Sequence, residues 1–173
     1  MCFYPTELNE EETSLYSVCV TLDGNFSLKR RDRQAGQQGD AANEPFRHFN
    51  SKYRLSNDFV ELFANQTISA DRTTGDSCED NWQAVRDDPQ VIKQFDENGV
   101  FMLTCCHGMA MGYADMIREA EGFKFGLSLV RWMLDQVPGR VTIGYDVACV
   151  FSKTFTRAPI MEDIDHTRVG FRK

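Results

Sequence analysis

The stretch Tyr16-Ser-Val-Cys-Val-Thr-Leu-Asp23 decides the fold, because its side chains alternate between apolar and polar with a period of two. Alternation of this kind, in a run rich in β-branched residues, is typical of a strand that buries one face. Asp23 then lies on the face opposite the apolar row. We therefore predict a sheet whose first strand carries a carboxylate near its end.

Further strands are expected at 99–106 and 140–146. The first of these is a continuous apolar run, as expected for a central strand buried on both faces. Helices are expected at residues 53–64, 82–91, 113–137 and 147–155, the third because apolar side chains from Phe123 to Val137 form one stripe. Strands interleaved with helices indicate an α/β protein.

Composition indicates one intracellular domain. The chain has 173 residues and a net charge of -7, from 19 basic and 26 acidic residues, which argues mildly against broad nucleic-acid binding. We find no signal peptide and no apolar run of the roughly 20 residues that a membrane span needs, so no membrane partner is expected. The six cysteines are then thiols or metal ligands. We divide the chain into a polar lead-in (1–13), a core (14–157) with a flexible insert at about 30–50, and a tail (158–173).

Two carboxylates are candidates for chemistry. Asp23 lies on the first strand, and Asp146 lies where a later strand ends and a helix is expected to begin. The ends of strands are a common place for a site in an α/β sheet, and two carboxylates brought together need a cation such as Mg²⁺. From spacing alone, ordinary strand-end aspartates remain the simpler interpretation.

Five segments, in order, carry a resemblance to a known family. They are Leu22-Asp-Gly-Asn-Phe-Ser-Leu-Lys-Arg30, Cys78-Glu-Asp-Asn-Trp82-Gln-Ala, Phe95 to Gly108, Asp115-Met116 with Glu121, and Ile143-Gly-Tyr-Asp146-Val-Ala-Cys149. Together they resemble the Kyakuja-Dileera-Zisupton transposases, which are abundant in fungi. Cys106 departs from the pattern, because the family usually has Arg there.

The resemblance implies a ribonuclease-H-like catalytic domain, with a mixed sheet flanked by helices, that cuts and rejoins DNA using a divalent metal and three acids. Asp23 would be the first-strand ligand and Asp146 the fourth-strand ligand of Mg²⁺ or Mn²⁺. The family's third acid lies on a later helix, and the surroundings of Glu162, Asp163 and Asp165 do not match its pattern. We therefore expect a partial fold that lacks its C-terminal part, a remnant that is inactive alone.

Two further sets of residues have both a functional and a plain interpretation. Cys78, Cys105, His107 and Cys149 could bind Zn²⁺, or they are buried thiols and a hydrogen-bonded histidine. Lys29, Arg30, Arg31 and Arg33 could contact DNA phosphates or direct the chain to the nucleus, or they are solvated surface. The implied partners are transposon-end DNA and a full-length transposase or a second copy. The alternative function is a non-catalytic DNA- or protein-binding module, possibly stabilised by zinc.

Overall fold

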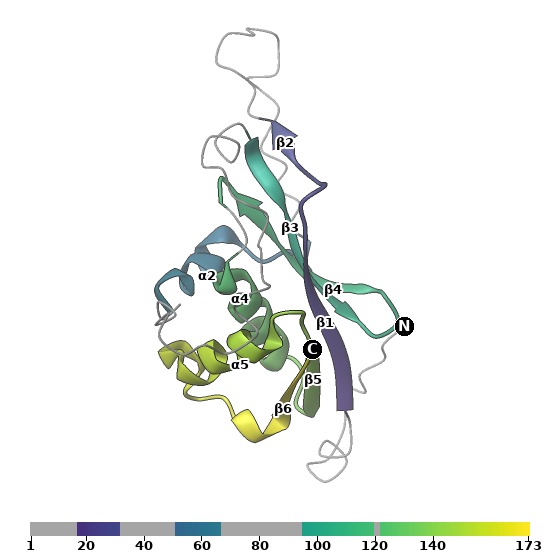
Figure 1. The fold of residues 1–173 in the computed structure, drawn as a ribbon, viewed down its shortest axis with the longest axis vertical. Coiled ribbons are helices and arrows are strands. Elements are labelled where there is room, and N and C mark those ends of the chain that lie inside the picture. Colours follow the sequence, from purple (N-terminus) through teal and green to yellow (C-terminus); the bar gives the residue numbers. More distant parts are fainter. Residues whose placement is uncertain (1–16, 32–50, 67–94, 120–121) are drawn as a thin grey trace, which may run out of the picture.

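The structure is a computed structural model that describes residues 17–31, 51–66, 95–119 and 122–173. These residues form a mixed α/β fold, in which helices pack on one face of a single sheet (Figure 1). No helix in the described part of the chain is long and apolar enough to cross a membrane. The expected helix at 82–91, and the lead-in at 1–13, lie outside the described residues.

The sheet joins an antiparallel half to a parallel half. Its strands are β1 (Ser17–Asn25), β2 (Arg30–Arg31), β3 (Phe95–Cys105), β4 (Ala110–Ile117), β5 (Arg140–Gly144) and β6 (Val169–Arg172). The long strands follow the order β4-β3-β1-β5-β6. The β4–β3 and β3–β1 pairs are antiparallel, and the β1–β5 and β5–β6 pairs are parallel. The short β2 pairs with the start of β3. The first strand is therefore central, with one neighbour of each kind.

The helices supply the other half of the core. The α-helices among the described residues are α2 (Asn57–Glu61), α4 (Phe123–Leu134) and α5 (Ala148–Arg157), with 3-10 turns η2 (Ala64–Gln66), η3 (Pro159–Met161) and η4 (His166–Arg168). All three α-helices lie on the same side of the sheet (Figure 1). A methyl group at Gly126 would come within 2.9 Å of the Phe151 ring, so this glycine lets α4 and α5 approach closely.

The predicted first strand is confirmed, with its faces as expected. Val20 and Leu22 are buried in the core, whereas Thr21 and Asp23 are exposed on the opposite face. The expected central strand at 99–106 is confirmed as part of β3, but it is not buried on both faces. Its Phe101 side is fully buried under the helices, and the opposite side is only half-buried.

The prediction of one helix over 113–137 is wrong in its first part. Residues 110–117 form strand β4, and the helix begins only at Phe123. Gly112, Ala114 and Met116 are buried and alternate with less buried neighbours, which is the period of a strand. The small residues at 112 and 114 hide this period from a search for large apolar side chains.

The segment 158–173, predicted to be a divergent tail, is folded onto the rest of the molecule. Arg131 on α4 donates from Nη1 to the carbonyl of Ile160 at 3.0 Å and from Nη2 to Asp163 Oδ2 at 2.8 Å. Arg168 donates to the carbonyls of Leu134 and Val137 at the end of α4. These bonds hold β6 beside β5, so the sheet gains a strand that the sequence did not predict.

Candidate functional site

The two candidate aspartates lie at the same end of two neighbouring parallel strands. The ladder between β1 and β5 begins at Ser17 opposite Arg140 and ends at Thr21 opposite Gly144. Asp23 and Asp146 each follow the last pair of this ladder by two residues, Asp23 still on β1 and Asp146 in the turn between β5 and α5. Because β1 and β5 are parallel neighbours, both aspartates lie beyond the same end of this ladder.

Both carboxylates belong to the face of the sheet that none of the described helices covers. Asp146 is exposed between the buried Tyr145 and Val147, which continues the alternation of β5 beyond its last ladder pair. Asp23 is exposed as well, and its Oδ1 accepts a hydrogen bond from the backbone N–H of Gly24 at 2.8 Å. That bond engages one of the two carboxylate oxygens of Asp23.

The tail acids are engaged elsewhere. The hydrogen bond from Arg131 lowers the pKa of Asp163 below its ordinary value and holds this carboxylate beside α4. Asp165 caps η4 by accepting bonds from the backbone and the hydroxyl of Thr167, which lower its pKa. Within the described ranges no group of three His, Cys, Asp or Glu side chains is arranged to hold a metal ion.

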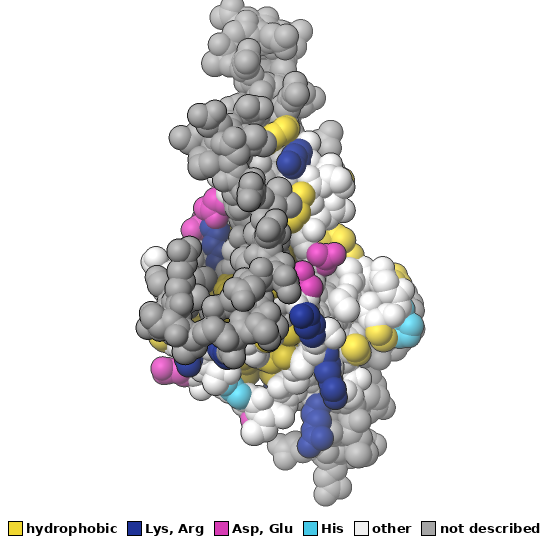
Figure 2. Space-filling model, viewed as in Figure 1, with side chains coloured by type: hydrophobic (Ala, Val, Ile, Leu, Met, Phe, Trp, Pro, Cys, Tyr) yellow, Lys and Arg dark blue, Asp and Glu magenta, His cyan; other side chains and the backbone are white. Residues whose placement is uncertain are grey.

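Basic residues lie on the same exposed face. Arg172 pairs with Gly144, and Arg140 lies on the same face of β5, so both arginines share the face of Asp146. Figure 2 shows Lys and Arg side chains in a column over the region of β5 and β6, next to acidic side chains. Sequence analysis missed both arginines, because only the register shows which face they occupy.

The predicted basic cluster is only partly described. Lys29 is exposed, and its Nζ lies 5.3 Å from the centre of the Phe95 ring. Arg30 and Arg31 form β2, and Arg33 lies outside the described residues. The insert expected at about 30–50 therefore begins with two residues in a strand.

The four predicted zinc ligands are not seen together. Cys78 lies outside the described residues. Cys105 is buried and Cys149 is half-buried in the first turn of α5, whereas His107 is exposed in the turn after β3. His107 Nδ1 lies 3.9 Å from Cys105 Sγ and 3.5 Å from Cys106 Sγ. The histidine therefore approaches two thiols, one of which was not among the predicted ligands.

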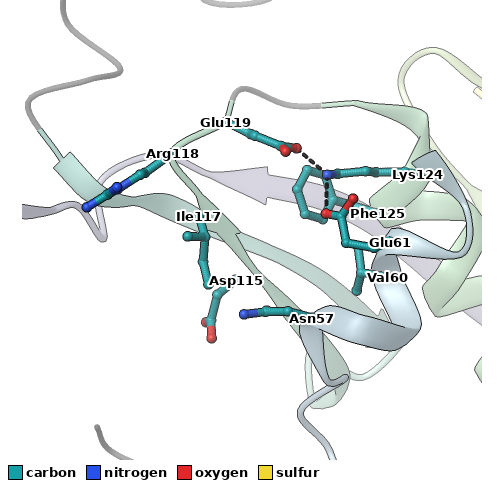
Figure 3. Close-up of a pocket in the computed structure, with 9 residues that line it drawn as sticks. All are labelled: Asn57, Val60, Glu61, Asp115, Ile117, Arg118, Glu119, Lys124 and Phe125. Atoms are coloured by element: carbon teal, nitrogen blue, oxygen red, sulfur yellow. Dashed lines mark hydrogen bonds and ion pairs between the residues drawn. The ribbon is translucent and has the colours of Figure 1, made fainter. Parts of the chain in front are cut away.

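A pocket of about 300 Å³ between α2, the end of β4 and the start of α4 is lined by an ionic cluster (Figure 3). Lys124 Nζ lies 2.7 Å from Glu61 Oε1 and also contacts Glu119. Burial lowers the pKa of Lys124, but the hydrogen bonds to these glutamates outweigh it and leave the pKa above its ordinary value. Asp115 accepts from Arg54 Nε at 2.6 Å. Each of these three carboxylates contacts one of the two cations, which is typical of a structural cluster.

Comparison with known proteins gives one match. The model of the family described as Kyakuja-Dileera-Zisupton transposase matches residues 16–172. No curated protein and no solved structure is significantly similar to the chain. The family match includes both aspartates and most of the segment that was predicted to diverge.

Proposed function

The chain belongs to the Kyakuja-Dileera-Zisupton transposase family, and from this we propose that it is a DNA strand-cleaving core to which Asp23 and Asp146 contribute two of three metal-binding acids. The register carries the proposal. Two acids that 122 residues separate in the sequence each follow the last pair of the β1–β5 ladder by two residues, and both are exposed. This equal offset supports a shared role for the two acids.

The ribonuclease-H-like architecture is part of the proposal. Without the two-residue β2, the long strands run β1, β3, β4, β5 and β6 along the chain. Asp23 then belongs to the first strand and Asp146 follows the fourth, as the family resemblance requires. The two strands are direct neighbours in the sheet, which supports this assignment of the two acids.

The family implies a divalent metal, and the two acids fit Mg²⁺ or Mn²⁺ in kind. Both ions prefer carboxylate oxygens, and Mg²⁺ often binds one or two protein carboxylates while keeping several waters. When bound, such an ion activates water and stabilises the leaving oxygen of a phosphodiester. The role of Asp23 and Asp146 is to hold it at the exposed face, where a DNA strand can approach.

Two acids alone bind such an ion weakly, so we propose that the isolated chain does not cleave DNA. Asp163 and Asp165 are poor candidates for the third ligand, because Arg131 and Thr167 already engage their carboxylates. A third acid from a second copy or from a full-length transposase would complete the site.

DNA binding is implied by the family, and we propose that Lys29 and Arg172 contact its phosphates. Both are exposed, and Arg172 shares the face of the acid pair. Removing one cation that binds a phosphate should reduce the slope of log affinity against log salt by about 1. Lys29→Ala and Arg172→Ala should therefore lower this slope, whereas Arg157→Ala, on α5 in the helical layer, should not. Because DNA is the substrate, we also propose a nuclear location.

The test of the acid pair combines metal binding with cleavage. Mn²⁺ binding is followed by electron paramagnetic resonance, and supercoiled plasmid with Mg²⁺ or Mn²⁺ reports cleavage. The wild-type chain should bind Mn²⁺ without cutting, and Asp23→Asn and Asp146→Asn should each abolish binding. Glu162→Gln, which removes an exposed acid of the tail, should have no effect.

Three other results of these experiments would contradict the proposal. Plasmid cleavage that both Asn variants abolish would show a complete site and refute the proposed inactivity. DNA binding that is independent of metal and unchanged in both variants would refute the assignment and favour a non-catalytic binding module. Stoichiometric zinc with loss of fold on chelation would favour the zinc-stabilised form of that module.

A further inference from the structure

Two exposed cysteines occupy opposed positions near the start of β1. The antiparallel ladder pairs Val20 with Cys105 and Thr21 with Thr104, so its next step places Cys19 opposite Cys106. The backbone N–H of Cys106 donates to the carbonyl of Cys19 at 3.0 Å, which shows that the pairing continues beyond the end of β3. Both cysteines are exposed and unlinked.

The spacing of this pair is within reach of a disulfide. Residues directly opposite in a hydrogen-bonded antiparallel pair have Cα atoms about 5.5 Å apart, within the range of disulfides. The next pair along the same face, Thr21 and Thr104, already brings its two side-chain oxygens to 2.6 Å. Side chains of similar size at the Cys19–Cys106 pair can therefore meet without a change of register.

We propose that Cys19 and Cys106 form a reversible cross-strand disulfide when the chain meets a small-molecule disulfide such as oxidised glutathione. His107 Nδ1 lies 3.5 Å from Cys106 Sγ and can accept its proton in the appropriate tautomer. The family usually has Arg in place of Cys106, so this site belongs to the present chain rather than to the family pattern.

The reaction balances as two thiol–disulfide exchanges. The Cys106 thiolate attacks one sulfur of oxidised glutathione, forms a mixed disulfide and releases a glutathione thiolate. The Cys19 thiolate then attacks the Cys106 sulfur, forming the protein disulfide and releasing the second glutathione. Two cysteine thiols are oxidised, one small disulfide is reduced, and the two protons pass to the released thiolates.

Cross-strand geometry also makes the bond reversible. Cβ atoms of directly opposed residues lie about 4.5–5.5 Å apart, whereas a relaxed disulfide needs about 3.5–4.5 Å. Closing the bond draws the strands together, and such strain makes a disulfide easier to reduce. In a reducing compartment a disulfide of this kind is transient and senses oxidation. It would clamp β1, which carries Asp23, to the turn between β3 and β4.

The test oxidises the folded chain with oxidised glutathione, alkylates the remaining thiols and maps the peptides by mass spectrometry. The expected product is one peptide pair joined through Cys19 and Cys106, lighter by two hydrogen atoms and restored by dithiothreitol. The melting temperature should rise by about 5–10 °C on oxidation, because a long loop is closed. The control Cys149→Ser changes a half-buried thiol on α5 and should keep both the joined peptide and the rise in melting temperature.

Cys19→Ser and Cys106→Ser should each abolish the joined peptide and the thermal shift. The proposal is overturned if both thiols of the oxidised wild-type chain remain open to alkylation, if each carries a stable glutathione, or if either joins another cysteine instead. Because the mapping uses the wild-type chain, it decides the question even if a serine variant fails to fold.

Discussion

Replacing Asp23 by Asn should change the stability of the protein in opposite directions with and without a divalent metal. Asn keeps the shape of the side chain and its oxygen can still accept from Gly24 N–H, so the substitution mainly removes a charge. Without metal, that charge repels Asp146 across the β1–β5 pair. With metal, the same charge is needed to bind the ion.

The magnitudes follow from the sheet geometry. Like charges about 5 Å apart on neighbouring strands repel by about 0.8 kcal/mol in water, and salt lowers this to about 0.5 kcal/mol. Removing the repulsion should raise the melting temperature by about 1–2 °C for a domain of this size. An ion present at ten times its dissociation constant stabilises the native state by about 1.4 kcal/mol, or about 3–5 °C.

The assay is thermal unfolding of the wild-type chain and of Asp23→Asn, first in EDTA and then over a Mg²⁺ titration. The variant should melt above the wild type in EDTA and below it at saturating Mg²⁺. Glu162→Gln serves as the charge-matched control and should show the same small shift in both conditions. A variant that is less stable than the wild type in EDTA, or equally responsive to Mg²⁺, would refute the close pairing of the two acids.

Three further outcomes are expected. Phe151→Ala should lower the free energy of unfolding in urea by about 3–5 kcal/mol, because this fully buried ring also fills the space that Gly126 leaves. A smaller decrease would contradict that packing. Asp163→Asn should make stability fall less steeply as the pH is lowered. A carboxylate with a lowered pKa stabilises the fold above its unfolded pKa, near 3.8, and this stabilisation is lost as pH falls through the folded pKa. An unchanged dependence of stability on pH would argue against the pair with Arg131. Lys124→Met should cost only about 1 kcal/mol, because its exposed glutamate partners can return to water. The variant should also lack the loss of stability that the wild type shows at alkaline pH. The glutamates raise the pKa of Lys124 in the folded protein, so the charged lysine stabilises the fold fully below its unfolded pKa, near 10.5. This stabilisation is lost as pH rises through the folded pKa.

The sequence predicted those parts of the fold that local periodicity determines. The alternation around Val20 identified β1 and its buried face, and the apolar stripe after Phe123 identified α4. Ser56 precedes the short helix α2, and its side chain accepts from the N–H of Phe59, the local cap that serine favours at this position. Each of these signals lies within a few residues of the element that it predicts.

What the sequence could not predict depends on register and on long-range contacts. The sequence of β4 lacks an alternation of large apolar and polar side chains, because the buried positions 112 and 114 hold Gly and Ala. The equal offset of Asp23 and Asp146 from the last β1–β5 pair depends on how these strands are aligned, and the place of Cys19 beside Cys106 depends on the alignment of β1 with β3. Whether Asp23 and Asp146 bind metal stays a prediction, because only their positions are known.

The central position of β1 has a consequence for synthesis of the chain. One edge of β1 can pair as soon as β3 has been made, but the other must wait for β5, which ends at Gly144, 39 residues after Cys105. At about 5–20 residues per second, ribosomes need several seconds for that stretch. During this interval an apolar strand edge is open to wrong partners. Chaperones that bind extended segments should therefore determine how much of the newly made protein reaches the native state.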